Sequence, residues 1–278
     1  MTRILLPEGV TRPNMAVMIA AWSPEQYLRF REERKQPFLD LLAMVDREPG
    51  MRIVDLGCGT GDLTLHLHTA LGARETIGVD TSPEMLAKAE VHRGRGLGFV
   101  QDDLASYGEG DCFDLVISNA ALHWVADHPA LLARLARQIR PGGQLAVQVP
   151  YNFDQPSHLA ANLAAQDAPF QLSLGGYVKP VHVLRPEHYA KLLHDLGFDQ
   201  SIVQMRVYQH LLPSRDDIVQ WVKGTTLTDY EKRLPPDLFD AFVERYRERL
   251  FELVGDERPL LFTFNRILMW ARRSAQPP

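Results

Sequence analysis

A glycine-rich turn between a predicted strand and a predicted helix carries the strongest chemical signal in this sequence. A short apolar strand pattern leads into Gly57, Gly59 and Gly61. Glycines at such a turn allow positive φ and a close approach of the backbone to a ligand. A dinucleotide-binding turn has its third glycine one position later, where this chain has Asp62. Asp55, just before the turn, would repel a pyrophosphate and attract a sulfonium, so the turn favours S-adenosylmethionine over NAD.

Polar side chains follow the next three predicted strands, at the point where each strand ends. They are Asp80, Asp103 and Asn119, in that order along the chain. A carboxylate such as Asp80 can accept hydrogen bonds from both vicinal hydroxyls of a ribose. Taken singly, an acid after a strand is more often a turn former or a helix cap. Together with the glycine turn, their order and spacing favour a nucleoside site.

These features resemble the nucleotide-binding half of Rossmann-like S-adenosylmethionine-dependent methyltransferases. The resemblance implies that Asp80 binds the ribose, and that Asp103, rather than Asp102, accepts a hydrogen bond from the adenine amino group. It also implies that Asn119 faces the methionine and methyl end of the ligand. The expected cofactor is therefore S-adenosylmethionine, as methyl donor. The residues expected to bind it in this half are Asp55, Gly57, Gly59, Asp80, Asp103, Leu104 and Asn119.

Further segments resemble a narrower family, the trans-aconitate methyltransferases, over roughly residues 22 to 273. These segments are Trp22 to Phe30, Arg34 to Pro37, Ser118 to Trp124, Val147 to Asn152, Pro156 to His158, Trp221 with Val222, and Ala271 to Arg273. In that family the N-terminal helices close over the cofactor. This implies that Tyr27 and Arg34 contact its methionine part. The alternative interpretation is that Tyr27 is a core residue and Arg34 a surface charge.

One segment of the predicted cap departs from that family. The family usually continues its cap motif into Gly-(Thr/Ser)-x-Leu-Arg-Pro, whereas this chain has Thr228 and Asp229 in place of Arg-Pro. An arginine can hold a carboxylate in a bidentate pair, and the departure removes that group. Lys223 or Arg266 would have to compensate for it. The departure therefore concerns the methyl acceptor rather than methyl transfer itself.

The expected chemistry places few demands on catalytic side chains. A carboxylate acceptor is already ionised at neutral pH, so no general base is needed, and alignment and exclusion of water supply the catalysis. His123, near the expected methyl end, is the one residue suited to acid–base work; a structural histidine beside Trp124 is the alternative. No histidine spacing suits a metal, so no metal is expected. The candidate substrate residues are Arg29, His123, Asn152, His158, Trp221, Lys223 and Arg266.

These observations lead to one main hypothesis and three alternatives. The main hypothesis is an S-adenosylmethionine-dependent O-methyltransferase that esterifies a small carboxylic acid, with trans-aconitate as first candidate and its monomethyl ester as product. The first alternative is a methyltransferase acting on a different small acceptor, such as a hydroxyl, an amine or a carrier-bound acid. A dehydrogenase is disfavoured by Asp55 and Asp62. A binding protein that keeps the cofactor but has no acceptor is disfavoured by Asn119 and by the predicted cap.

Composition excludes several other classes of protein. A net charge of −5 argues against a nucleic-acid-binding surface, which needs a basic face. Two cysteines, Cys58 and Cys112, exclude a disulfide framework and favour a reducing cytoplasm. No apolar run approaches the ~20 residues of a membrane span, and the N-terminus does not resemble a secretory signal. We expect a cytoplasmic monomer that acts on a small-molecule carboxylate, with neither nucleic acid nor membrane as partner.

The elements that position these residues alternate between strand and helix as far as Pro150. Predicted strands cover residues 52–56, 75–80, 97–101, 113–118, 144–149, 200–212 and 260–271, and a turn covers 140–143. Alternating strands and helices predict a mostly parallel sheet. After Pro150, helices at 155–166, 186–196, 215–223 and 236–253 and a loop at 167–185 are inserted before and between the last strands. The fold class is therefore α/β: a Rossmann-like, seven-stranded, mostly parallel sheet with helices on both faces and an inserted helical cap.

The expected domain organisation follows from these elements. Residues 1–21 are predicted to be a disordered extension, and residues 22–273 a single methyltransferase domain. Within it, lid helices over 24–47, broken at Pro37, precede a cofactor-binding core over 50–150. The cap and the last strands occupy 151–273.

Overall fold

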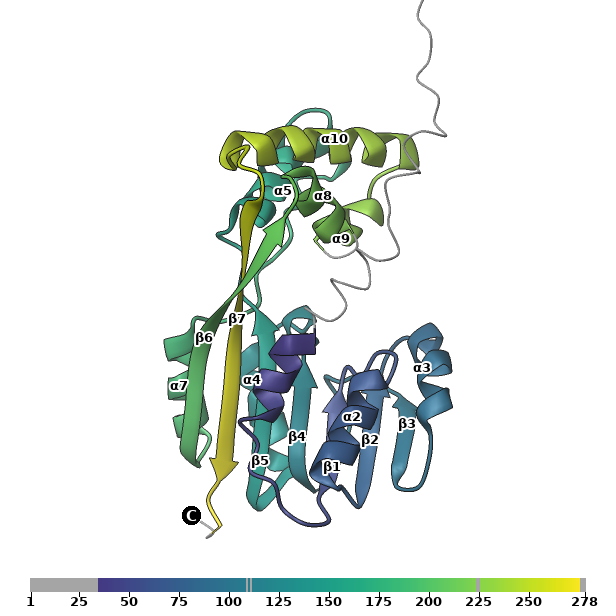
Figure 1. Cartoon of the computed structure of the whole chain (residues 1–278), viewed down its shortest axis with the longest axis vertical. Helices are drawn as coiled ribbons and strands as arrows, with labels where there is room; N and C mark the ends of the chain where they lie inside the picture. The colour runs from purple at the N-terminus through teal and green to yellow at the C-terminus, as the bar shows by residue number, and fades with distance from the viewer. Residues whose placement is uncertain (1–34, 109, 111, 224–225, 276–278) are drawn as a thin grey trace, which may run out of the picture.

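The computed structural model describes residues 35–108, 110, 112–223 and 226–275 (Figure 1). The predicted extension over 1–21, the first part of the predicted lid helices, and the candidate residues Tyr27, Arg29 and Arg34 lie outside these residues.

The described residues form one seven-stranded sheet in the order β3-β2-β1-β4-β5-β7-β6. Its strands are β1 (Arg52–Leu56), β2 (Glu75–Asp80), β3 (Leu97–Gln101), β4 (Phe113–Asn119), β5 (Ile139–Pro150), β6 (Phe198–Leu212) and β7 (Leu260–Arg273). The pairs among β1 to β5 are parallel, and β7 runs antiparallel to both β5 and β6. The order reverses between β1 and β4, which is where ligands bind in open α/β sheets, at the carboxyl ends of the strands. The predicted fold class is confirmed.

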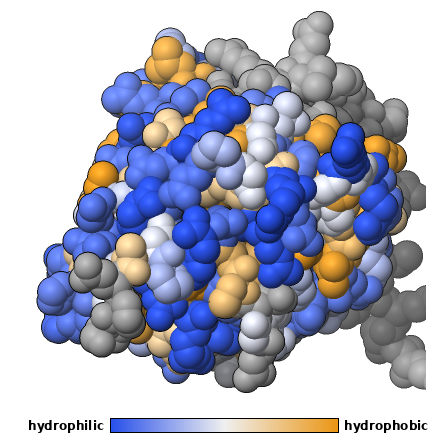
Figure 2. Space-filling view, turned by 90° about the horizontal axis from the view of Figure 1, so that it is seen from below, coloured by the Kyte–Doolittle hydropathy of each residue, from blue (hydrophilic) through white to orange (hydrophobic). Residues whose placement is uncertain are grey.

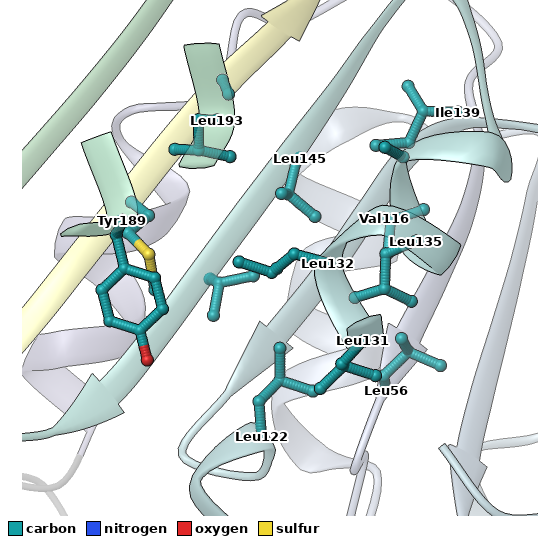
Figure 3. Close-up of a cluster of buried hydrophobic side chains, with 14 of the residues drawn as sticks. Leu56, Val116, Leu122, Leu131, Leu132, Leu135, Ile139, Leu145, Tyr189 and Leu193 are labelled. Atoms are coloured by element: carbon teal, nitrogen blue, oxygen red, sulfur yellow. The ribbon is translucent and has the colours of Figure 1, made fainter. Parts of the chain in front are cut away.

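Helices cover both faces of the sheet because successive strand residues point to opposite sides. Val54, Val116 and Leu145 join one buried cluster with α4 (His128–Arg137) and α7 (Pro186–Asp195), part of which Figure 3 shows. Their neighbours Ile53 and Leu115 join the opposite cluster with α2 (Asp62–Leu71) and the helical residues 35–42. A smaller cluster at the β3 edge contains residues of α3 (Pro83–Ala89). The sheet is therefore the middle layer of three.

The cap forms a separate core beyond the carboxyl ends of the parallel strands (Figure 1). It contains α5 (Pro156–Gln166), α6 (Phe170–Ser173), α8 (Asp216–Lys223), α9 (Thr228–Glu231) and α10 (Pro236–Leu253). The buried alanines of α5 let α10 pack closely against it, with Phe242 and Tyr246 in the same cluster. The long strands β6 and β7 reach from the sheet into this core, since Leu212 and Phe262 are buried in it. The cap is thus fixed to the sheet by two continuous strands.

The face of the molecule opposite the cap is an exposed, mostly polar surface (Figure 2). Seen from below, it is covered mainly by hydrophilic residues, with hydrophobic ones scattered among them (Figure 2). In the part of the chain that the structure describes, no helix has both the length and the apolar character needed to cross a membrane.

Four local predictions are corrected. Pro37 does not end a helix, because residues 35–42 are continuously helical; a proline disturbs the turn before it rather than the residues after it. The predicted turn at 140–143 lies inside β5, whose pairing with β4 shifts register there. The predicted loop at 167–185 contains the short helix α6, and α9 was not predicted. A helix of four residues is too short to show an apolar period.

A buried polar network joins α7 to the residues that follow β4. Burial lowers the pKa of His128, so its ring is neutral and has one N–H. His128 Nε2 donates to the Leu122 carbonyl oxygen (3.1 Å), which leaves Nδ1 to accept from the Tyr189 hydroxyl. That hydroxyl accepts in turn from the Leu184 amide (3.1 Å). The network therefore links the 3-10 turn η3 (Leu122–Trp124) to the segment before α7.

Replacing Tyr189 by phenylalanine is expected to lower the free energy of unfolding by about 1–3 kcal/mol, because the His128 Nδ1 and the Leu184 amide would lose their partner. Tyr246 is the matched control: it is equally buried, at 0% exposure, but its hydroxyl has no hydrogen-bond partner among the described residues. Tyr246→Phe should therefore be neutral or stabilising. Urea unfolding of both variants measures the difference, and equal losses in the two would contradict this account of the network.

Candidate functional site

The glycine turn connects β1 to α2 at the carboxyl edge of the sheet. Gly57, Gly59 and Gly61 all have positive φ, of 83°, 56° and 76°. The Gly57 amide donates to the Val79 carbonyl oxygen (2.8 Å), which ties the turn to β2. A Cβ at Gly57 would overlap Ala121, whereas one at Gly59 would meet no atom of the described residues within 4 Å. Gly57 is therefore required by packing, and Gly59 leaves an open surface on which a ligand can lie.

Two carboxylates flank this turn. Asp80 accepts hydrogen bonds from the Gly59 amide and the Ser82 amide, both at 2.9 Å, one on each oxygen. Each oxygen keeps further lone pairs for a ligand. Asp55 is only 4% exposed and accepts from the Thr64 hydroxyl (2.7 Å). Burial, together with the nearby charge of Asp80, raises the pKa of Asp55 to about 6. A cationic ligand would favour the ionised form of Asp55.

The predicted adenine residues lie after β3. Asp103 is exposed, and its Oδ1 accepts from the Ala105 amide (2.8 Å), as in a helix-cap turn. Leu104 is half-buried and packs against the cluster beneath the sheet. The adenine contact of Asp103 and Leu104 stays a prediction.

The chain turns sharply after β4. Ala120 has a φ of 53°, which is uncommon for a residue other than glycine and costs of order 1–3 kcal/mol. The Oδ1 atom of Asn119, one residue earlier, is buried and has no hydrogen-bond partner among the described residues. An unpaired buried acceptor is costly unless a ligand supplies a donor. The Asn119 Oδ1 atom can therefore accept a hydrogen bond from a donor-bearing ligand.

A cavity of about 450 Å³ adjoins this turn, and residues at the end of the sheet and residues of the cap line it. Five of the seven candidate substrate residues line it: His123, Asn152, His158, Trp221 and Arg266. Its other lining residues are Leu63, Asn119, Ala120, Trp124, Pro150, Phe153, Asn162, Lys179, Pro180, Val181, His182, Val183, Thr226, Tyr230 and Phe264. The structure thus brings segments from both halves of the chain to one cavity.

Two candidates are placed elsewhere. Arg29 lies outside the described residues. Lys223 is exposed at the end of α8 and is not among the described residues that line the cavity, so its contact with the substrate stays a prediction. Residues two positions apart in an α-helix are separated by about 200° of rotation around its axis. Lys223 and the cavity-lining Trp221 therefore point to nearly opposite sides of α8.

Asn152 lines the cavity, but its polar atoms serve the fold. Its Nδ2 donates to the Asn265 carbonyl oxygen (3.0 Å) and its Oδ1 accepts from the Asn265 amide (2.7 Å). The side chain therefore fixes the loop after β5 to β7, beside Arg266.

Two histidines in the cavity wall are held neutral. Burial, reinforced by the charges of Lys179 and Arg266, lowers the pKa of His123 to about 3, and burial with Lys179 lowers that of His158 to about 4. His158 has hydroxyl partners in Ser157 (3.2 Å) and Thr226 (3.3 Å). His123 lies beside Trp124, with ring centroids 4.7 Å apart, and its Nδ1 has no partner among the described residues. A neutral ring with a free nitrogen can position a ligand, but it is a weak base.

The two cations of the cavity wall come from distant segments. Arg266 on β7 donates to Gln148 Oε1 (3.2 Å) and lies over the Phe264 ring, 4.9 Å from its centroid. Lys179 was missed by the sequence analysis, because it lies in the segment predicted as a loop and no motif marks it. Among the described residues, the cavity lining includes these two cations and no aspartate or glutamate. The described part of the cavity wall is therefore suited to an anion.

The neutral histidines predict a loss of stability in acid. The unfolded chain binds protons at these histidines near pH 6.5, whereas the folded pKa values are about 3 and 4. The free energy of unfolding should therefore fall as pH drops below about 6.5, by up to about 1.4 kcal/mol per pH unit for each histidine. His123→Gln should give a shallower slope between pH 6.5 and 4.5 in urea titrations. An unchanged slope would show that His123 is not held neutral by the fold.

Comparisons with known proteins agree with this geometry. Residues 27–203 match a family of methyltransferase domains. The chain is 40% identical over 258 residues to a trans-aconitate 2-methyltransferase of Deinococcus radiodurans, covering 91% of this chain and 98% of that protein. It is 34% identical to that of Mycobacterium tuberculosis, covering 90% and 96%.

Solved structures support the fold alone. The YcgJ protein of Bacillus subtilis has a TM-score of 0.58 at 17% identity and covers 86% of this chain and 98% of its own. A phosphoethanolamine N-methyltransferase of Haemonchus contortus, solved with S-adenosylhomocysteine, has a TM-score of 0.54 at 18% identity, covering 86% and 53%. Among the described residues, no group of three or more histidine, cysteine, aspartate or glutamate side chains is arranged to hold a metal ion.

The relatives named above are 34% and 40% identical to this chain and cover 90% and 91% of it. The chain therefore belongs to the trans-aconitate 2-methyltransferase family of Rossmann-like, S-adenosylmethionine-dependent methyltransferases.

Proposed function

We propose that this methyltransferase esterifies a carboxyl group of a small acid, and that trans-aconitate, which its curated relatives are named for, is the first acceptor to test. One observation carries the proposal. The cavity beside Asn119 and Ala120 is lined by Lys179 and Arg266 and, among the described residues, by no acid. A wall with this charge attracts an anion and repels an amine in its protonated form.

The residues of the turn suit S-adenosylmethionine as methyl donor. The open surface at Gly59 accommodates the nucleoside, and Asp80 has lone pairs for the ribose hydroxyls. The unpaired Asn119 Oδ1 would accept from the ammonium of the methionine part, and Asp55 adds negative charge near the sulfonium. When bound, S-adenosylmethionine supplies a methyl group whose transfer to a carboxylate oxygen breaks the carbon–sulfur bond and leaves a neutral thioether, with no proton to move.

Because this methyl transfer moves no proton, the chain's own residues would have to bind and align the reactants rather than act as acids or bases. Arg266 and Lys179 would hold the acceptor carboxylates, and the neutral His123 would position the acceptor by a hydrogen bond rather than remove a proton. The aromatic side chains of the cap would exclude water from the cavity. Alignment of two bound reactants can contribute ~7–11 kcal/mol in favourable cases. A hydroxyl or amine acceptor would need a stronger base than a histidine whose pKa is near 3.

An acceptor panel with a radiolabelled methyl donor tests this function. It should include mono-, di- and tricarboxylates, phenols and amines at equal concentration. We expect label in carboxylates only, with trans-aconitate among the best. Label in phenols or amines alone would overturn the carboxyl assignment and favour the alternative small acceptor. No label in any acceptor, with the donor still bound, would instead favour a binding protein.

A further inference from the structure

We propose that Lys179 forms a second carboxylate-binding subsite in this cavity, in addition to Arg266, and that Asp229 holds the lysine in place. The site would then select acids with two or more carboxylates over monoacids. This inference rests on the proposed carboxyl methylation and assigns the residue that distinguishes among its acceptors.

Lys179 is fixed at the cavity wall from three sides. Its Nζ lies 3.1 Å from Asp229 Oδ2 and 4.3 Å from the centroid of the Trp124 ring. Its backbone amide donates to the Tyr230 hydroxyl (3.3 Å), which itself donates to Asn162 Oδ1 (3.2 Å). With 24% of its side chain exposed, Lys179 is far more restrained than a surface lysine. Fixing a cation before the ligand arrives reduces the entropy cost of binding.

The ion pair leaves the cationic side of Lys179 available to a ligand. Lys179 lines the cavity, whereas its partner Asp229 does not, so the acid supports the lysine from outside. An ammonium has three N–H donors, and Asp229 accepts one of them. The charge of Lys179 is also felt inside the cavity, because it contributes to the lowered pKa of both His123 and His158. The lysine therefore acts on the same space as Arg266.

This arrangement gives a physical reason for the departure at residues 228 and 229. Where the family's cap motif usually has Arg-Pro, this chain has Thr228 and Asp229 on α9. The acid at 229 pairs with Lys179, which belongs to a segment about fifty residues earlier in the sequence. In place of the family's arginine on this segment, Lys179 would supply the positive charge, and Asp229 of α9 would hold it. Asp229 is a positioning residue in this account, because it acts through Lys179.

The ligand class follows from two separate cations. One carboxylate of the acceptor must present its oxygen to the methyl donor, so a second carboxylate is needed to occupy the other cation. A monoacid can pair with only one of the two cations, so it lacks the second charge-assisted hydrogen bond and binds more weakly. Polycarboxylates of small size, such as trans-aconitate, meet both requirements.

Lys179→Met tests the subsite, with Lys179→Arg as the charge-conserving variant and Lys191→Met as the control. Lys191 is an exposed lysine of α7 that pairs with Asp195, outside the cavity lining. Calorimetry with S-adenosylhomocysteine present gives the Kd of trans-aconitate and of crotonate, a monoacid, without turnover. We expect Lys179→Met to weaken trans-aconitate binding by about 10- to 100-fold and to lower its selectivity over crotonate at least tenfold. Lys179→Arg and Lys191→Met should stay within about threefold of the wild type.

Several outcomes would overturn the subsite. The subsite would be contradicted if Lys179→Met bound trans-aconitate with unchanged affinity, or if it lost affinity equally for trans-aconitate and crotonate. Thermal unfolding and donor affinity of each variant are measured first; if Lys179→Met does not fold, Lys179→Gln replaces it. A double-mutant cycle tests Asp229: Asp229→Ala should weaken trans-aconitate binding in the wild type but not in Lys179→Met. If the wild type methylates no carboxylate, the proposed function fails and the subsite falls with it; turnover with an unchanged Kd in Lys179→Met overturns the subsite alone.

Discussion

Replacing Asp80 by alanine is expected to weaken S-adenosylmethionine binding by 100-fold or more. In the proposed site the Asp80 carboxylate would accept hydrogen bonds from both ribose hydroxyls, and a hydrogen bond to a charged group contributes about 1.5–3 kcal/mol. Two such bonds correspond to roughly 10²- to 10⁴-fold in Kd. The substitution also removes the acceptor for the Gly59 amide, so the turn that carries the ligand loses one of its anchors.

Asp102→Ala is the control for this prediction. Asp102 follows the neighbouring strand β3, is exposed, and accepts from the Asp103 amide (2.7 Å). Calorimetry with S-adenosylmethionine and S-adenosylhomocysteine should show near-normal affinity in Asp102→Ala, and both variants should unfold within a few degrees of the wild type. Undiminished binding by Asp80→Ala would contradict the placement of the methyl donor on this turn.

Arg266→Met is expected to lower kcat/KM for the best carboxylate acceptor by about 10²- to 10³-fold, with donor affinity unchanged. Removing one partner of a desolvated charge pair costs about 2–5 kcal/mol. Methionine keeps an unbranched apolar stem that can still pack on Phe264, so the change acts mainly on charge. Because the acceptor is an anion in the ground state and in the transition state, most of the loss should appear in KM.

Arg137→Met controls for the loss of a positive charge alone. Arg137 is exposed on α4 and does not line the cavity. Initial rates over a range of acceptor concentrations separate KM from kcat in both variants. A loss in Arg266→Met that appears equally in donor affinity would indicate a disturbed fold, and no loss at all would contradict an anion-binding role.

The strand ends that carry the cofactor candidates could be predicted because their signals are local. Gly57, Gly59 and Asp80 lie at the ends of strands whose order follows from the alternation of strand and helix, and parallel strands bring their carboxyl ends to one edge. The same reasoning explains the agreement in strand bounds. Prediction from these patterns fails where one or a few residues decide the backbone conformation, as at Pro37 and around residues 140–143.

The acceptor half depends on packing between segments far apart in the sequence. Lys179 belongs to a segment with no periodic pattern, and its partner Asp229 lies on a helix of four residues. No motif marks Lys179, and the cap motif marks the position of Asp229 without indicating its partner. Lys223 was a reasonable candidate by charge, but helix geometry turns it away from Trp221. Contacts across the cap, rather than residue types, decide which charge reaches the cavity.

The most direct test of carboxyl methylation is the chemical stability of the product. The purified protein is incubated with S-adenosylmethionine radiolabelled in the methyl group and with trans-aconitate, and the isolated product is treated with mild alkali. A methyl ester releases its label as volatile methanol, whereas a methyl group on an ether oxygen, nitrogen or carbon does not. We predict that the label becomes volatile and that Arg266→Met forms far less of this product. Label that stays with the acid after alkali, or no label in the acid at all, would contradict esterification of trans-aconitate by this protein.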